Sequence, residues 1–213
     1  STLLASSAAS DVYKRQEKPR KVEVDKSLFT TSADEILDNR DINLIVEVID
    51  QADAAYSIVK RALLRGIPVV SGNKTMLAHH LPELIEIQKT HNVALLYDAS
   101  SCGSIPVIRN LEEYYDNDLL LEVKGILNGS SNYILSRVFD HAESYDSALA
   151  QAQALGYAEA DPSADIDGLD IQRKLILSAN VAFGVSLREA DVPVFGIRNV
   201  RKPDICLLYT SDA

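Results

Sequence analysis

Several carboxylates and a lysine that could do chemistry lie in residues 155–174, which read LGYAEADPSADIDGLDIQRK. The five carboxylates of this run belong to Glu159, Asp161, Asp165, Asp167 and Asp170. Pro162 disfavours helical structure in its neighbourhood, so we expect Glu159, Asp161 and Asp165 to lie in a non-helical stretch. Asp167 is placed to cap the helix that follows.

Lys174 follows Asp170 by four residues on a helix expected over residues 169–183, so the two side chains share one face of that helix. The same face continues through Leu177 and Val181, which are apolar. Because the face continues with apolar residues, we expect the Asp170–Lys174 pair to lie at the edge of a buried cleft. The alternative is an ordinary exposed ion pair, worth a few tenths of a kcal/mol.

A second candidate is the SGNK turn at residues 71–74, between a strand expected at 68–70 and a helix expected at 77–91. In an open parallel sheet, ligands collect beyond the carboxyl ends of the strands. Lys74 is therefore expected to point toward a bound cofactor or substrate. The alternative is a turn with a solvated lysine.

Two further stretches carry weaker indications. In DASSCGSIP, residues 98–106, small side chains allow a ligand to approach the backbone closely. Backbone carbonyl oxygens beside the Asp98 carboxylate would suit a hard cation. The alternative is a loop without a ligand. In NGSSNYIL, residues 128–135, the free amide groups of a helix start suit a carboxylate. Simple helix capping explains this second stretch equally well.

The elements that position these residues alternate in the first half of the chain. Strands are expected at residues 44–49, 68–70 and 93–97, and helices at 33–37, 52–65 and 77–91. Gly66 and Pro68 are placed to end the second helix. Strands and helices that alternate in this way predict right-handed βαβ units and a parallel sheet with helices on both faces, an α/β fold.

The regular alternation of strands and helices ends at Pro106. Helices are expected at residues 107–115, 130–139, 147–155 and 169–183, and strands at 119–126 and 194–200. These elements predict a second, α+β unit.

Composition excludes several classes of protein. The 213 residues carry a formal net charge of -10, which argues against a nucleic-acid partner, because binding a phosphate backbone needs a clustered basic surface. Cys102 and Cys206 lack the spacing of a disulfide framework or a zinc site. No apolar run approaches the roughly 20 residues that span a bilayer, and the N-terminus does not resemble a signal peptide. We therefore expect a cytoplasmic protein with no membrane partner.

The motifs also resemble those of one enzyme family. GILNGSSNYIL at residues 125–135, followed by LGYAEADPSADIDGLDIQRK at 155–174, is similar to the homoserine dehydrogenase signature. SGNK and DASSCGSIP fall in the family's order upstream. The resemblance is specific because the four motifs together are long and occur in the family's order. Each motif alone would be weak evidence.

The resemblance implies a Rossmann-type NAD(P)-binding domain over residues 17–106 and an α+β catalytic and dimerisation domain over 107–205. The implied activity interconverts L-homoserine and L-aspartate 4-semialdehyde with NAD or NADP, in the biosynthesis of threonine, methionine and isoleucine. The intact enzyme is expected to be a homodimer. The alternatives are another Rossmann oxidoreductase for a small substrate, or a ligand-binding or oligomerisation module without chemistry.

The resemblance also implies roles for single residues. Lys174 would be the acid/base that protonates the alkoxide oxygen, oriented by Asp165, and Lys74 would lie between substrate and nicotinamide. A lysine suits proton transfer where burial lowers the pKa of its ammonium group. Glu159 and Asp170 would hold the ammonium group of the substrate, to which their negative charge is complementary.

Further family positions concern the cofactor and a cation. Gly156 matches a backbone contact to the cofactor. Residues that match a loop for a monovalent cation, such as sodium, are Asp98, Ser101, Gly103 and Ile105. The family usually has glutamate at the position of Asp98 and a loop richer in glycine.

The largest departure from the family is that no GxGxxG turn, whose amides would cradle a pyrophosphate, occurs in the 213 residues. The chain is therefore expected to be an internal fragment that lacks this segment and the C-terminal return segment, with exposed strand edges and no measurable homoserine oxidation by itself. Residues 1–16 and 206–213 resemble translated read-through and are expected to be non-native tails.

Overall fold

The computed structural model describes residues 11–12, 28–115, 119–200 and 204. The chain divides into two compact units, Ser1–Glu113 and Tyr114–Ala213. Each unit is described by itself below.

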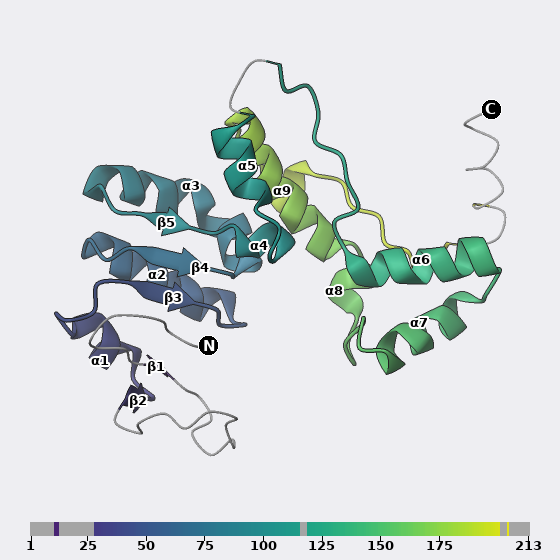
Figure 1. Cartoon of the computed structure of the whole chain (residues 1–213), viewed down its shortest axis with the longest axis horizontal. Helices are drawn as coiled ribbons and strands as arrows, with labels where there is room; N and C mark the ends of the chain where they lie inside the picture. Colours follow the sequence, from purple (N-terminus) through teal and green to yellow (C-terminus); the bar gives the residue numbers. More distant parts are fainter. Residues whose placement is uncertain (1–10, 13–27, 116–118, 201–203, 205–213) are drawn as a thin grey trace. The chain divides into compact units, whose positions relative to one another are not determined.

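The first unit is built on a parallel sheet, as the alternating pattern predicts (Figure 1). Its strands are β3 (Ile45–Glu47), β4 (Val69–Ser71) and β5 (Leu95–Leu96), hydrogen-bonded in that order. The helices α2 (Ala52–Leu64) and α3 (Lys74–His91) connect them and pack against each other on the sheet. The predicted βαβαβ order is therefore confirmed. The expectation that these helices cover both faces is wrong, because α2 and α3 pack against each other on one face of the sheet.

Short-range signals set the ends of these two helices. Gly66, with a φ of +73°, follows α2, and Pro68 cannot continue it. The helix α3 begins three residues before the expected start at residue 77, because the Asn73 side chain accepts a hydrogen bond from the Met76 amide at 2.9 Å. This cap makes Lys74 the first residue of α3.

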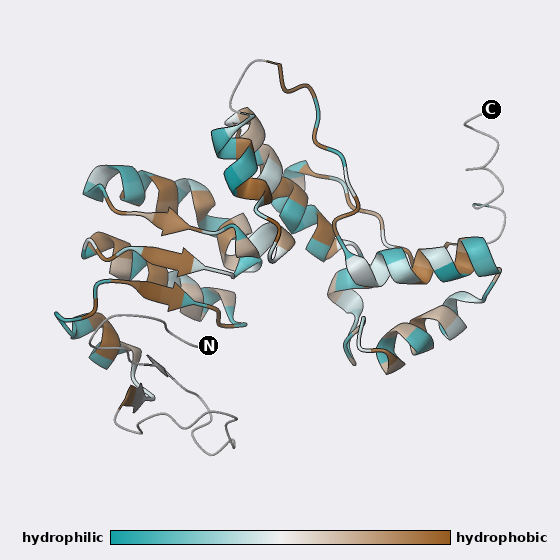
Figure 2. Cartoon of the chain, viewed as in Figure 1, coloured by the Kyte–Doolittle hydropathy of each residue, from teal (hydrophilic) through white to brown (hydrophobic). Residues whose placement is uncertain are grey.

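Apolar residues of the strands and of the inner faces of α2 and α3 form the core of this unit. Val69, Val59, Leu63, Met76 and Leu84 are completely buried. Figure 2 shows the three strands as predominantly hydrophobic segments. The carboxyl ends of β3 and β4 are thus held on a rigid base.

Smaller elements complete the unit. The helix α1 (Ala33–Asp38) is capped by Ser32, and α4 (Ala99–Cys102) and α5 (Val107–Glu113) follow β5. The strands β1 (Asp11–Val12) and β2 (Phe29–Thr30) form a separate parallel pair. The pair includes two residues of the N-terminal stretch that we expect to be non-native; the rest of that stretch, and residues 206–213, lie outside the described residues.

In the described residues of the second unit, the regular secondary structure is helical. It contains α6 (Gly129–His141), α7 (Tyr145–Ala154), α8 (Ser163–Ile166), α9 (Leu169–Phe183) and the 3-10 helix η2 (Glu189–Asp191). A small core of Ile134, Ala148, Ala152, Ala158 and Ile166 joins α6, α7 and α8. The predicted end of α9 at Gly184 is confirmed by the φ of +61° at that residue.

Two strand predictions in this unit are wrong. Residues 119–126 form no strand, and Leu119 and Leu121 are 85% and 88% exposed. Residues 194–200 form none either; the Ile197 amide donates to the Ile166 carbonyl at 2.7 Å, and Arg198 pairs with Asp167. Alternation in a sequence indicates only that a segment can pair, and the described residues of this unit provide no neighbouring strand for it.

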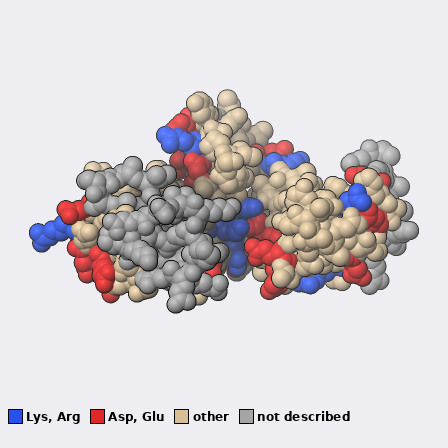
Figure 3. Space-filling model, turned by 60° about the horizontal axis from the view of Figure 1, so that its bottom comes forward, with Lys and Arg blue, Asp and Glu red and all other residues tan. Residues whose placement is uncertain are grey.

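Charged side chains of both signs are interspersed on the surface shown in Figure 3. Ion pairs among the described residues include Lys60 with Glu83 and Arg61 with Asp38, each at 2.7 Å. Within the described residues, no helix is both long enough and apolar enough to cross a membrane.

Candidate active site

At the carboxyl edge of the sheet, a buried glutamate ties β3 to the SGNK turn. Glu47, the last residue of β3, is 2% exposed. Its Oε2 accepts a hydrogen bond from Ser71 Oγ at 2.5 Å, and its Oε1 accepts one from the Ile49 amide at 2.6 Å. Burial raises the pKa of the Glu47 carboxyl, and the hydrogen bonds from Ser71 and Ile49 oppose that rise.

Asn73 extends this network to the start of α3. Its backbone amide donates to Ser71 Oγ at 3.2 Å, and its side-chain Nδ2 donates to the Ile49 carbonyl at 2.9 Å. The same side chain caps α3 through its Oδ1. The backbone that carries Lys74 is therefore fixed beyond the carboxyl ends of β3 and β4, where ligands of open α/β sheets bind.

The candidate cation loop contains a short helix, α4. Asp98 precedes it, and the Arg109 amide donates to Asp98 Oδ1 at 2.9 Å. Ser101 is 1% exposed, and its hydroxyl group has no hydrogen-bond partner among the described residues. Gly103 has a φ of +60°, and Ile105 is exposed.

In the second unit, Asp170 and Lys174 form an ion pair that is largely buried. Lys174 Nζ lies 2.7 Å from Asp170 Oδ2 and donates to the Leu127 carbonyl at 2.8 Å. The side chains of Lys174 and Asp170 are 17% and 6% exposed. The i,i+4 spacing and the apolar continuation of the helix face therefore indicated the pairing and the burial correctly.

Asn128 joins this pair to a further carboxylate. Its Nδ2 donates to Asp165 Oδ1 at 2.7 Å and to Asp170 Oδ2 at 2.9 Å. Its Oδ1 accepts the Ser131 amide at 2.8 Å and so caps α6. The helix capping considered for this stretch is therefore confirmed. The contacts with the two carboxylates come from the Asn128 side chain and not from the free backbone amide groups that we expected to hold a carboxylate.

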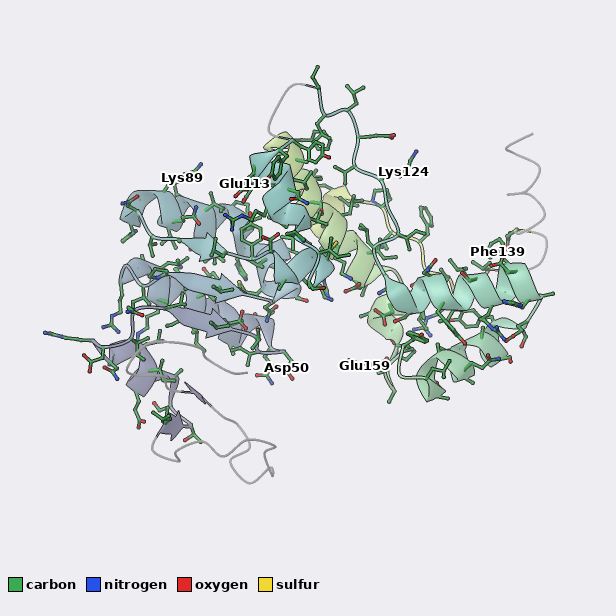
Figure 4. The ribbon with its side chains drawn as sticks, viewed as in Figure 1. Asp50, Lys89, Glu113, Lys124, Phe139 and Glu159 are labelled. Carbon is green, nitrogen blue, oxygen red and sulfur yellow. The ribbon has the colours of Figure 1, made fainter. Side chains whose placement is uncertain are left out.

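The loop between α7 and α8 carries Gly156 and Glu159. Ser130 Oγ donates to the Tyr157 carbonyl at 2.5 Å, and the rings of Tyr133 and Tyr157 stack with centroids 4.9 Å apart. The loop is thereby fixed to α6. Glu159 is exposed on this loop (Figure 4), and Gly156 has a φ of +78° with open space where a Cβ would lie.

Two expectations for residues 159–167 are wrong. Asp165 lies in the short helix α8, because Pro162 stands at the N-cap, where a proline costs no backbone hydrogen bond. Asp167 does not cap α9; Gly168 takes the N-cap position with a φ of +83°. The Asp167 carboxylate pairs with Arg198 instead, which holds its pKa below the usual range.

The structure thus brings Asp165, Asp170 and Lys174 into one network, with Glu159 and Gly156 on a loop of the same unit. Lys74 and the residues of the cation loop belong to the other unit. Sequence reasoning did not select Glu47, and it considered Asn128 only as part of a helix start whose backbone amides could hold a carboxylate. The sequence did contain a signal for Glu47. It is a carboxylate in an otherwise apolar strand, two residues after the buried Ile45 and therefore on the same face.

The donor set favours acid–base chemistry and the binding of a charged group. A buried lysine beside carboxylates can transfer a proton, and an exposed carboxylate such as that of Glu159 can hold an ammonium group. Among residues 28–115 and 119–200, no three His, Cys, Asp or Glu side chains gather in a way that could hold a metal ion.

Comparison with known proteins gives the family. A family model described as the NAD binding domain of homoserine dehydrogenase matches residues 5–98, and the model described as homoserine dehydrogenase matches residues 106–212. The chain belongs to the homoserine dehydrogenase family. The resemblance inferred from the four motifs is therefore confirmed, and the α/β fold with a separate catalytic domain agrees with it.

Individual homoserine dehydrogenases match most of the chain. That of Synechocystis sp. is 38% identical over 189 residues, which are 89% of this chain and 44% of the relative. A crystal structure of a homoserine dehydrogenase from Thiobacillus denitrificans superimposes with a TM-score of 0.80 at 33% identity, over 86% of this chain and 42% of that one. The chain thus spans less than half the length of these homoserine dehydrogenases.

A third match includes a cofactor. A hyperthermophilic archaeal homoserine dehydrogenase mutant in complex with NADPH superimposes with a TM-score of 0.68 at 30% identity. The match covers 82% of this chain and 53% of the archaeal chain. Together with the family model for an NAD binding domain, it supports a nicotinamide dinucleotide as the cofactor of the family to which this chain belongs.

Proposed function

We propose that this chain carries the substrate-binding and proton-transferring part of an NAD(P)-dependent homoserine dehydrogenase, which interconverts L-homoserine and L-aspartate 4-semialdehyde. The observation that carries the proposal is the buried network of Lys174, Asp170, Asn128 and Asp165. The network lies within the segment that the homoserine dehydrogenase family model matches.

Lys174 is the residue that moves the proton. In the direction of oxidation, its amine takes the proton from the substrate hydroxyl group, and in the reverse direction its ammonium group returns a proton to the alkoxide oxygen. NAD or NADP, when bound, accepts or supplies the hydride. Asp170 contacts Lys174 directly, and Asp165 acts on the same network through Asn128.

Glu159 and Asp170 are assigned to the substrate's ammonium group. Glu159 is exposed and accessible to a ligand, whereas Asp170 is buried beside Lys174. In this proposal the ammonium group of the amino acid binds these carboxylates and its hydroxyl group contacts Lys174. Two carboxylates near one cation provide the electrostatic complementarity that a zwitterionic substrate needs.

Lys74 and Gly156 are assigned to the cofactor. Lys74 starts α3 beyond the carboxyl end of β4, where its ammonium group can contact a nicotinamide or a substrate. The backbone at Gly156 lies beside open space, so that a ligand can approach it closely. Both positions fit a nicotinamide dinucleotide.

A monovalent cation such as sodium is assigned to the loop of Asp98, Ser101, Gly103 and Ile105. The buried hydroxyl group of Ser101, which has no hydrogen-bond partner among the described residues, fits a small hard cation. The Asp98 carboxylate would balance the charge of that cation.

A homodimer is also part of the proposal. Residues of the second unit expose large apolar side chains, among them Leu119, Leu121, Ile126 and Phe195. A second copy that covers such side chains would remove apolar surface from water.

Isothermal titration calorimetry of the 213-residue chain, with and without NADPH, tests the substrate assignment. We expect L-homoserine to bind at least about tenfold more tightly than 4-hydroxybutyrate, which lacks the ammonium group, because a charged hydrogen bond is worth about 1.5–3 kcal/mol. L-2-aminobutyrate, which lacks the hydroxyl group, is the matched control for the Lys174 contact. Preference for another hydroxy acid would favour a different oxidoreductase, and no binding of any of them would favour a module without chemistry.

A further inference from the structure

We propose that Asn128 is a positioning residue of this site, whose side-chain amide holds Asp165 and Asp170 together and thereby fixes the Lys174 ammonium group. The part of this inference that concerns homoserine rests on the proposed function. The part that concerns the carboxylates rests on the geometry alone.

The orientation of the Asn128 side chain is set by its cap. Asn128 is 6% exposed, and its Oδ1 accepts the Ser131 amide at the start of α6. With Oδ1 bound there, Nδ2 is left to donate elsewhere. It lies 2.7 Å from Asp165 Oδ1 and 2.9 Å from Asp170 Oδ2, and its two hydrogens allow one bond to each carboxylate.

This arrangement joins three segments that are distant in sequence. Asp165 lies on α8 and Asp170 on α9, 37 and 42 residues beyond Asn128. Two carboxylates repel each other, and a group that donates one hydrogen bond to each reduces the cost of keeping both ionised. Asn128 therefore does more than satisfy a helix end.

The same turn also holds Lys174. Its Nζ binds Asp170 Oδ2, the atom that Asn128 also contacts, and the carbonyl of Leu127, the residue before Asn128. A displacement of Asn128 would change the position of the Asp170 carboxylate and of the Lys174 ammonium group together. The titratable groups that face the Asn128 amide are thus Asp165 from α8 and Asp170 from α9, with Lys174 on the far side of Asp170.

A cap alone does not require asparagine. Aspartate and serine cap helices about as well, since a cap needs only the side-chain oxygen. What asparagine adds is the NH2 group. Asn128→Asp is isosteric and keeps the cap, but it turns an oxygen toward two carboxylates. Asn128→Ser keeps the cap, removes the NH2 group and adds no charge.

The experiment measures homoserine binding to the 213-residue chain and both variants by calorimetry across pH, together with a carbon-13 NMR titration of the aspartate carboxyl groups. For Asn128→Asp we expect at least about tenfold weaker binding at neutral pH, partly regained as the pH falls and one carboxyl of the cluster is protonated. For Asn128→Ser we expect a smaller loss, with the pH profile of the unchanged chain.

The proposal is overturned if Asn128→Asp binds homoserine as the unchanged chain does, or if both variants lose binding equally at every pH. If the unchanged chain does not bind homoserine, the proposed function fails for this chain, and the NMR titration still decides the role of Asn128. A carboxyl that titrates at higher pH in Asn128→Asp than in the unchanged chain supports that role. Unaltered carboxyl titrations overturn it.

Discussion

Two buried polar side chains, Glu47 and Asn128, organise the candidate residues of their units. Glu47 binds Ser71 and the Ile49 amide at the carboxyl edge of the sheet, and Asn128 binds Asp165 and Asp170. Each joins segments that lie more than 20 residues apart in the chain. Burying a polar side chain costs desolvation free energy. Several hydrogen bonds to the same side chain can offset that cost.

Glu47 gives the first unit a predictable response to pH. Burial raises the pKa of its carboxyl in the folded state, so the folded state binds the proton more tightly than the unfolded chain does. Its contribution to stability is therefore complete below the ordinary glutamate pKa and is lost as the pH rises through the raised value. We expect Glu47→Gln, which cannot ionise, to remove this loss.

Denaturant unfolding of the chain and of Glu47→Gln, repeated from about pH 4 to neutral pH, measures the effect. The free energy of unfolding of the unchanged chain should fall relative to the variant as the pH rises. Parallel curves for the two proteins would show that the Glu47 carboxyl titrates at its ordinary pKa.

Local sequence spacing revealed part of this residue-scale picture. Asp170 and Lys174 were found because residues four apart on a helix must be neighbours. The bridge from Asn128 was not predictable, since nothing local indicates which carboxylates will meet an amide 37 residues away. Asp167 was misassigned because Arg198, 31 residues further on, competes for its carboxylate.

At the scale of elements, the junction of α8 and α9 depends on one glycine. Gly168 has a φ of +83°, and a Cβ there would lie 2.7 Å from Val194 Cγ2 and 3.1 Å from the Phe195 carbonyl oxygen. Both the backbone conformation and the close approach of residues 194–195 exclude a larger residue. The junction carries Asp165 on one side and Asp170 on the other, so Gly168 sets their separation.

Gly168→Ala tests this constraint, with Gly184→Ala as the matched control. Gly184 has a φ of +61°, and a Cβ there would meet no heavy atom within 4 Å, so its substitution costs only the left-handed conformation, about 1–2 kcal/mol. Gly168→Ala should cost roughly 1–3 kcal/mol more, because the Phe195 backbone must move. Equal losses in the free energy of unfolding for the two variants would contradict the close approach.

Element prediction succeeded where local signals and packing agree. The helix ends at Gly66 and Gly184 follow from glycines that adopt positive φ. The strands expected at residues 119–126 and 194–200 did not form, because a strand depends on a partner that the sequence of the segment does not reveal. The short helices α4 and α8 were missed for the opposite reason, since four residues are too few to show periodicity.

At the scale of the whole molecule, the two units divide the proposed chemistry between them. The family model for the NAD binding domain matches residues 5–98, and the model for homoserine dehydrogenase matches residues 106–212. In the proposed division, the first unit contacts the hydride carrier through Lys74. The second unit adds a cofactor contact at Gly156, binds homoserine and moves its proton.

The most direct test of this division is the steady-state oxidation of homoserine by Lys174→Ala, in the chain extended by the parts of the Synechocystis homoserine dehydrogenase that lie outside the 189 matched residues. We predict that kcat falls about 10²–10⁴-fold, the usual contribution of a general base, with little change in KM. Lys89→Ala, which removes an exposed lysine from the last turn of α3, should leave the rate unchanged (Figure 4). Full activity of Lys174→Ala would contradict the central role given to this lysine.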